Sequence, residues 1–149
     1  MNDIMAYYYR ADLSKYTSAI YPITKMINSV DELRAYYTNN KDKYQFQTRR
    51  RGESSMAEAV FGDRSSFNDT FFEYKSLLLI LLEETSGSVR HRVDDVSAEK
   101  NSLSVNITRI LPEIGTMDMA QWHIVLELEK AWSAMDVAVI VSDEQLADR

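Results

Sequence analysis

The feature that most constrains this chain is a continuous apolar run at residues 77–82, followed by segments in which apolar and polar residues alternate. Alternate side chains of a strand point to opposite sides of its sheet, so the run predicts a strand buried on both faces. Alternation with a period of two predicts half-buried strands. Such segments occur at residues 89–93, 103–107 and 122–128, and residues 137–141 predict a last short strand. Short turns at residues 85–88 and 97–102 separate the first three of these strands. The pattern therefore predicts an antiparallel meander of about five strands.

The first half of the chain predicts two helices. Ser29, followed three residues later by Glu32, matches a capping box, in which the two residues satisfy backbone N–H groups at a helix start. A helix is therefore predicted over residues 30–40. A second, shorter helix is predicted over residues 66–74, with Ser66 as its N-cap.

Helices that precede a run of strands, rather than alternating with them, are typical of the α+β class. We therefore predict two N-terminal helices packed on a mainly antiparallel meander sheet, within a single domain of residues 1–149. Residues 20–27 predict one more short strand, and Pro22 favours a sheet edge because proline lacks an N–H group. Residues 1–18 show no clear period, so their interpretation as a flexible segment stays open.

Charge is divided unevenly along the 149 residues, whose formal net charge is −6. The first 75 residues contain 11 basic and 10 acidic side chains, whereas the remaining residues contain 6 basic and 13 acidic ones. An acidic half repels phosphates, which disfavours direct nucleic-acid binding and suits a basic protein partner. Solubility alone is the alternative explanation of the same charge.

Composition also limits chemistry and compartment. The absence of cysteine excludes disulfides, a thiolate nucleophile and cysteine-based zinc sites. The N-terminus, MNDIMAYYYR, lacks the basic and apolar regions of a signal peptide, which fits the cytoplasm for the chain as given. Many secreted Gram-positive proteins also lack cysteine, so the compartment stays open. No apolar run approaches the roughly 20 residues that cross a bilayer, and no membrane partner is expected.

Residues that resemble catalytic or metal-binding groups lack the spacing that such sites require. His91 and His123 are the only histidines, and neither belongs to an HExxH or His-x-His pattern. Ser86, His91 and Asp94 lie close in sequence, but no Gly-x-Ser-x-Gly elbow accompanies them, and serines in turns commonly bond to the backbone. The glycines form no phosphate-binding loop. We therefore expect no cofactor and no metal site.

Three short segments are candidates for contact with another protein: a serine-glycine turn, a later loop that is rich in methionine, and a run of three arginines. Methionine is adaptable and recurs at protein-binding surfaces. Packing of the loop and of the following tryptophan over the end of the sheet is the alternative. The candidate contact residues are Ser86, Gly87, Ser88, Arg90, His91, Met117, Asp118, Met119, Trp122, Arg49, Arg50 and Arg51.

The stretches FFEYKSLLLILLEETSGSVRHRV and SLSVNITRILPEIGTMDMAQWHIVLELEK carry a resemblance to a known kind of domain. Together they resemble a small uncharacterised domain of secreted proteins from Gram-positive, especially clostridial, bacteria. More distantly they are similar to the C-terminal domain of a bacterial protease-complex subunit. The turn at residues 85–88, Pro112 and residues 122–130 match that domain. The resemblance implies a non-enzymatic sheet that contacts a protein through an exposed turn, in relatives that are exported.

Three hypotheses about function follow. The first is a non-enzymatic protein-binding module that modulates or inhibits its partner. The second is an acidic, phage-encoded inhibitor of a nucleic-acid machine, of the anti-CRISPR type, which acts as a nucleic-acid mimic and binds in a salt-dependent way. The third is a hydrolase that uses carboxylates or His91.

Overall fold

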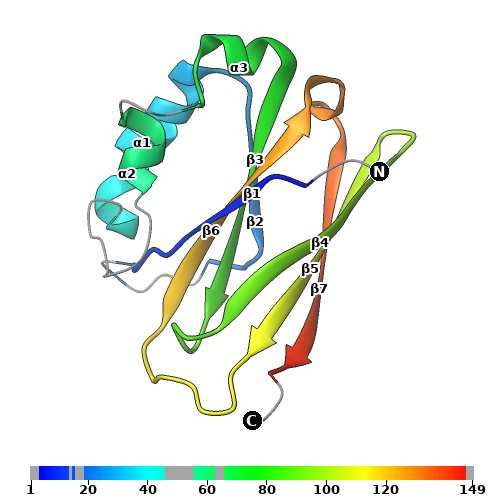
Figure 1. The fold of residues 1–149 in the computed structure, drawn as a ribbon. Helices are drawn as coiled ribbons and strands as arrows, with labels where there is room; N and C mark the ends of the chain where they lie inside the picture. The colour runs from blue at the N-terminus through cyan, green and yellow to red at the C-terminus, as the bar shows by residue number, and fades with distance from the viewer. Residues whose placement is uncertain (1–3, 14, 16–18, 46–55, 63–65, 147–149) are drawn as a thin grey trace.

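The computed structural model describes residues 4–13, 15, 19–45, 56–62 and 66–146, and Figure 1 shows their arrangement. Over these residues the fold is mainly β, with seven strands in two sheets and with 47% strand against 23% helix. The prediction of an α+β fold, with two N-terminal helices on one meander sheet of about five strands, is therefore wrong. The elements in chain order are β1 (Ala6–Tyr9), β2 (Ile23–Ile27), α1 (Val30–Tyr44), α2 (Met56–Phe61), α3 (Asp69–Tyr74), β3 (Lys75–Glu84), β4 (Arg90–Glu99), β5 (Ser102–Leu111), β6 (Ala120–Glu129), η1 (Lys130–Trp132) and β7 (Asp136–Gln145).

Sheet A contains strands β1, β6, β3 and β2 in that order, and all of its pairs are antiparallel. Its two central strands, β3 and β6, pair along their whole length, from Lys75 opposite Glu129 to Glu84 opposite Ala120. The side chains of residues 76–82 are all buried, which confirms the prediction that the apolar run forms a strand covered on both faces.

Sheet B contains strands β4, β5 and β7, and it is not a meander. Strands β4 and β5 form an antiparallel hairpin, but β7 runs parallel to β5, from Ser102 opposite Asp136 to Leu111 opposite Gln145. The chain leaves sheet B after β5, forms the central strand β6 of sheet A, and then returns. The meander prediction was wrong because a period of two shows which side chains share a face, and it does not show which strand lies next to which.

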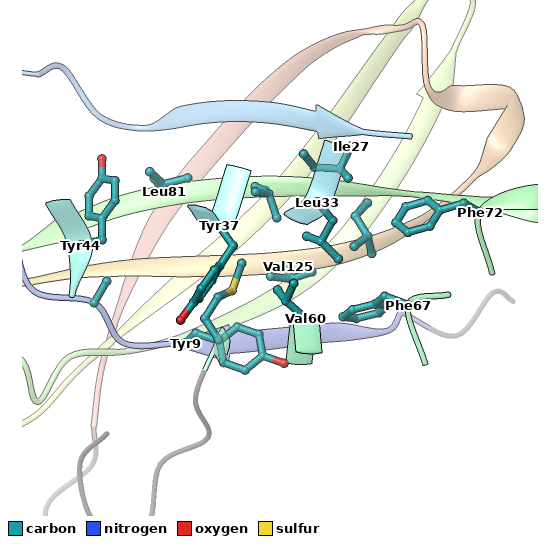
Figure 2. Packing of buried hydrophobic residues seen from close by; sticks show 14 residues of the cluster. Tyr9, Ile27, Leu33, Tyr37, Tyr44, Val60, Phe67, Phe72, Leu81 and Val125 are labelled. Atoms are coloured by element: carbon teal, nitrogen blue, oxygen red, sulfur yellow. The ribbon is translucent and has the colours of Figure 1, made fainter. Parts of the chain in front are cut away.

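The chain forms three layers, namely the helices, sheet A and sheet B (Figure 1). Between the helices and sheet A lies one core cluster, in which Leu33 and Tyr37 of α1 pack against Leu79 and Val125, as Figure 2 shows in part. The second cluster fills the space between the sheets, where Ile80 packs among apolar residues of β4, β5 and β6. Each leucine or isoleucine that is fully buried in these cores stabilises the fold by roughly 2 kcal/mol.

Helix α1 begins at the predicted capping residue. The backbone N–H of Glu32 donates to Ser29 Oγ at 3.1 Å, and Glu32 Oε1 accepts from the N–H of Asn28 at 2.6 Å. The helix extends past residue 40 to Tyr44 and ends at Gln45, whose φ of 53° places it in the left-handed region. Lys41 and Lys43 in the last turn interact favourably with the negative end of the helix dipole.

The shorter elements differ more from the sequence-based prediction. Helix α3 is capped by Asn68, whose Oδ1 accepts from the N–H of Phe71 at 2.9 Å, and not by Ser66. The sequence predicted no element at residues 6–9. In the structure, Ala6–Tyr9 pair with β6 and form the edge strand β1. Strand β2 begins after Pro22 and pairs only with β3, so the prediction of an edge strand there is confirmed.

Candidate protein-contact site

Two connections lie side by side at one end of the two sheets, at the bottom of Figure 1. Residues 85–89 join β3 to β4, and residues 112–119 join β5 to β6. The register explains their proximity, because Glu84 lies opposite Ala120 in sheet A and Arg90 lies opposite Ile110 in sheet B. Both connections therefore cross between the same two sheets at the same end. We call residues 85–89 and 112–119 together the paired-loop surface.

Hydroxyl groups link the two connections. Ser86 Oγ lies 2.7 Å from Ser88 Oγ and 3.1 Å from Thr116 Oγ1. The backbone N–H of Thr116 donates to Ser88 Oγ at 3.1 Å. A Cβ atom on Gly115 would lie 2.9 Å from Ser86 Oγ, so a side chain there would push the two connections apart. The turn and the loop thus hold each other in one arrangement.

An ion pair from the N-terminal segment fastens the same loop. Arg10 Nη2 donates to Asp118 Oδ2 at 2.5 Å, and the Arg10 side chain is mostly buried. Hydrogen bonds from the Thr116 side chain and from Arg10 hold the pKa of Asp118 well below its usual range. The guanidinium of Arg10 lies against Gly87, where an added Cβ would come within 2.2 Å of Arg10 Nη1. A side chain at position 87 would therefore displace the Arg10 guanidinium from its present position.

The paired-loop surface exposes large apolar side chains. Ile114 is 86% exposed, Met117 is 99% exposed and Met119 is 43% exposed. Their exposure is not the result of a loose loop, because Thr116 and Asp118, on either side of Met117, are held by the contacts described above. A constrained loop that directs apolar groups into solvent is a feature of contact surfaces.

The other candidate contact residues occupy different places. Trp122 lies in the core between the sheets with only 4% of its surface exposed, and the exposed Arg90 guanidinium lies 5.2 Å from its ring centroid. Arg90 Nη1 also donates to the carbonyl of Gly87 at 2.7 Å. His91 is buried against Trp122, with ring centroids 5.8 Å apart. The arginine triplet at residues 49–51 lies outside the described residues.

A buried charged cluster lies directly behind the paired-loop surface and was missed by the sequence analysis. Glu84, at the end of β3, is 2% exposed and accepts hydrogen bonds from Arg109 and from His91 Nε2, the latter at 2.8 Å. Burial raises the pKa of Glu84, but the hydrogen bonds from Arg109 and His91 outweigh that effect and lower it to about 2. Arg109 also bonds to Asp143 of β7 at 2.8 Å. The cluster therefore ties β3 of sheet A to all three strands of sheet B.

The second histidine lies on the opposite face of sheet A. His123 Nε2 is 2.8 Å from the hydroxyl of Tyr36 in α1, and its ring packs edge-on against Tyr44. Burial lowers the pKa of His123 to about 3, so the ring is neutral at physiological pH. His91 and His123 are separated by the central sheet and cannot share a ligand. Among the described residues, no group of three or more histidine, aspartate or glutamate side chains is placed to hold a metal ion.

A groove of about 560 Å³ lies toward the other end of the sheets, and Met5, Leu128 and Trp132 are among the residues that line it. Its carboxylate Glu127 is already bonded, since it accepts from the hydroxyl of Tyr7 at 2.6 Å and lies 3.8 Å from Lys75 Nζ. In the described part of the chain, no helix is long and apolar enough to cross a membrane.

Comparisons with protein-family models, with curated proteins and with solved structures find no match to this chain. The resemblance to a secreted Gram-positive domain and to a protease-complex subunit therefore stays a prediction.

Proposed function

We propose that this chain is a non-enzymatic protein-binding module that contacts its partner through the paired-loop surface. The main support for the proposal is that the backbone of the loop is held in place while its apolar side chains are exposed to solvent. Hydrogen bonds and the Arg10–Asp118 ion pair fix the loop backbone, while Ile114 and Met117 remain almost fully exposed. A surface of this kind loses little conformational entropy when it binds, because its backbone is already ordered.

The hypothesis of a hydrolase receives less support from the geometry. A general base must come within hydrogen-bond reach of its substrate. His91 is buried and bonded to Glu84, and His123 is enclosed between sheet A and the helices. Neither side chain lies where a substrate from solvent reaches it.

The acidic-inhibitor hypothesis is the second candidate, and the position of the arginines weakens it. Mimicry of nucleic acid needs a row of unpaired carboxylates. On the outer face of sheet B, Arg92 pairs with Asp94 at 2.5 Å and with Glu144 at 3.3 Å. These ion pairs reduce the net negative charge of the face that would act as the mimic, although Asp95 and Glu99 on β4 remain exposed.

The test compares two isoleucines of nearly equal exposure. Ile114 in the paired-loop surface is 86% exposed, and Ile20, which lies outside it, is 87% exposed. The wild-type chain and the variants Ile114→Ser, Met117→Ser and Ile20→Ser are used as bait in lysate of the native host, and captured proteins are quantified by mass spectrometry. We expect Ile114→Ser and Met117→Ser each to reduce capture of a specific partner about tenfold, since burial of a large apolar side chain contributes roughly 1.5–3 kcal/mol.

The matched variant Ile20→Ser should capture the partner as well as the wild-type chain does. A partner captured equally by all four baits would contradict the proposal. Repeating the capture at low and at physiological salt separates the two candidates, because an apolar contact persists at both and an acidic mimic loses its partner as salt increases.

A further inference from the structure

The outer edge of β7 is the least protected strand edge among the described residues. The other sheet edges carry features that hinder pairing with a second chain. Strands β1 and β2 have 4 and 5 residues, and β2 contains Lys25 and follows Pro22. Strand β4 carries a register irregularity between Val93 and Asp95 and several charged side chains. Strand β7 has 10 residues, DVAVIVSDEQ, with no proline, no lysine and no register shift against β5. Its acidic residues lie toward the ends and leave residues 137–142 without charge.

The backbone hydrogen bonds show which groups of β7 face outward. The N–H of Asp136 donates to the carbonyl of Asn101 at 2.9 Å, and the N–H of Leu146 donates to the carbonyl of Leu111 at 2.8 Å. Alternate residues of a strand direct their N–H and C=O groups to the same side, so the even-numbered residues bond to β5. The outer edge therefore presents the N–H and C=O groups of Val137, Val139, Val141, Asp143 and Gln145.

We propose that this edge pairs with the same edge of a second copy of the chain, as an antiparallel strand pair around a twofold axis at Val141. Such an axis keeps the outer faces of the two copies of sheet B on the same side. Odd-numbered residues therefore lie opposite odd-numbered residues, and even-numbered residues lie opposite even-numbered ones. With Val141 opposite Val141 of the second copy, Val139 lies opposite Asp143 and Val137 lies opposite Gln145. Every outward-facing residue of β7 then exchanges backbone hydrogen bonds with the second copy.

This register keeps the acidic side chains of the two copies from lying directly opposite each other, so charge does not oppose a second copy as the occupant. The acidic residues of β7 are Asp136, Asp143 and Glu144, and in the proposed register none of them lies opposite another. A shift that places Ile140 opposite Ile140 would set Asp136 against Glu144, which is unfavourable. Asp143 and Glu144 are also paired within their own chain, with Arg109 and Arg92.

Exposed apolar side chains gather at the centre of the same edge. Ile140 is 52% exposed and Val141 is 38% exposed. In the proposed pair, Val141 contacts its own counterpart, and the two copies of Ile140 lie diagonally across from each other on the outer face, within reach of large side chains. The pairing therefore covers the apolar part of the edge as well as its backbone groups.

The first experiment measures the mass of the full chain by sedimentation velocity, from about 1 µM to about 1 mM, where moderate and weak complexes dissociate. We expect a concentration-dependent species of twice the 17.2 kDa of one chain. Val141→Lys places two like charges against each other at the twofold axis and should raise the dimer dissociation constant about 100-fold. The control is Ser97→Lys, an exposed position on the other edge of sheet B, which should leave that constant unchanged.

The second experiment uses the absence of cysteine to check the register. In the proposed pair, the Cα atoms of the two copies of residue 141 lie about 5.5 Å apart, which is within disulfide range. The two copies of residue 138 lie six residues out of register, about 20 Å apart. Mild oxidation should therefore link Val141→Cys chains into a dimer and leave Ala138→Cys chains unlinked.

Four results would overturn the proposal. The first is a chain that stays monomeric over the whole concentration range. The second is a dimer that Val141→Lys and Ser97→Lys affect equally. The third is cross-linking of Ala138→Cys in preference to Val141→Cys. Binding of an unrelated strand peptide at the β7 edge, without self-association, would equally exclude a second copy as the natural occupant.

Discussion

Replacing Glu84 by glutamine tests whether the buried charged cluster is what fastens the two sheets together. Glu84 is nearly inaccessible to solvent, and its carboxylate accepts from Arg109 and from His91. The Glu84→Gln change keeps the size of the side chain and removes its negative charge. It leaves Arg109 without its buried anionic partner, and loss of one partner of a buried pair is strongly destabilising.

The pKa of Glu84 sets the size and the pH dependence of this effect. The pKa falls from 4.5 to about 2 in the folded chain. This lowering of the Glu84 pKa corresponds to roughly 3 kcal/mol of folding free energy at pH 7. Because the folded pKa is the lower one, this contribution is complete above pH 4.5 and is lost as the pH falls toward 2. At pH 3 less than half of it remains.

Urea unfolding at pH 7 and at pH 3 measures both quantities. We expect Glu84→Gln to be less stable than the wild-type chain by about 3 kcal/mol at pH 7, and the difference to be less than half as large at pH 3. Glu99→Gln, at an exposed position of β4, serves as the control and should change stability by less than about 0.5 kcal/mol at either pH. A Glu84→Gln effect of equal size at both pH values would refute the assignment of this stability to the ionised carboxylate.

Three further perturbations test other parts of the structure. Gly87→Ala should displace the Arg10 guanidinium, break its bond to Asp118 and speed amide hydrogen exchange in residues 115–118, with a loss of about 1–3 kcal/mol of stability. The imidazole NMR signals of His123 should not titrate between pH 8 and pH 4, because burial lowers its pKa to about 3. The same histidine in the unfolded chain has a pKa of 6.5 and takes up a proton first, so the stability of the fold should decrease as the pH falls below 6.5. Leu79→Ala, in the core below the helices, should cost about 2–5 kcal/mol in urea unfolding.

Some of the fold follows from local patterns in the sequence, and some depends on contacts that those patterns do not encode. The apolar run predicted the doubly covered strand β3, and Ser29 predicted the start of α1, because both signals are local. The central position of β6 in sheet A was missed because Val125 is the only apolar side chain on one of its faces, although the polar Gln121 and His123 on that face are also buried. The parallel pairing of β7 has no local signal, because it depends on the return of the chain from sheet A.

In the candidate site, too, some features have local sequence signals and others depend on contacts between distant segments. The sequence singled out the turn around Gly87 and the loop around Met117, but their contact depends on the register of four strands. Arg10 was missed because no pattern in a tyrosine-rich N-terminal segment connects it with Asp118. Glu84 had a usable signal, since it shares the face of Leu82 at the end of a buried strand, where an acidic side chain needs a cationic partner.

The direction of β7 links the two proposed surfaces. The strand ends at the paired-loop surface, where Gln145 Nε2 donates to the carbonyls of Leu111 and Pro112 at 3.2 Å. In an antiparallel β7 pair, the two copies of that surface would therefore lie at opposite ends of the joined sheet. One small partner could not contact both, so a dimer would bridge two partner molecules and would gain avidity only toward partners that are themselves multimeric or clustered. Val141→Lys and Ile114→Ser separate the two properties, because each changes one surface and leaves the residues of the other in place.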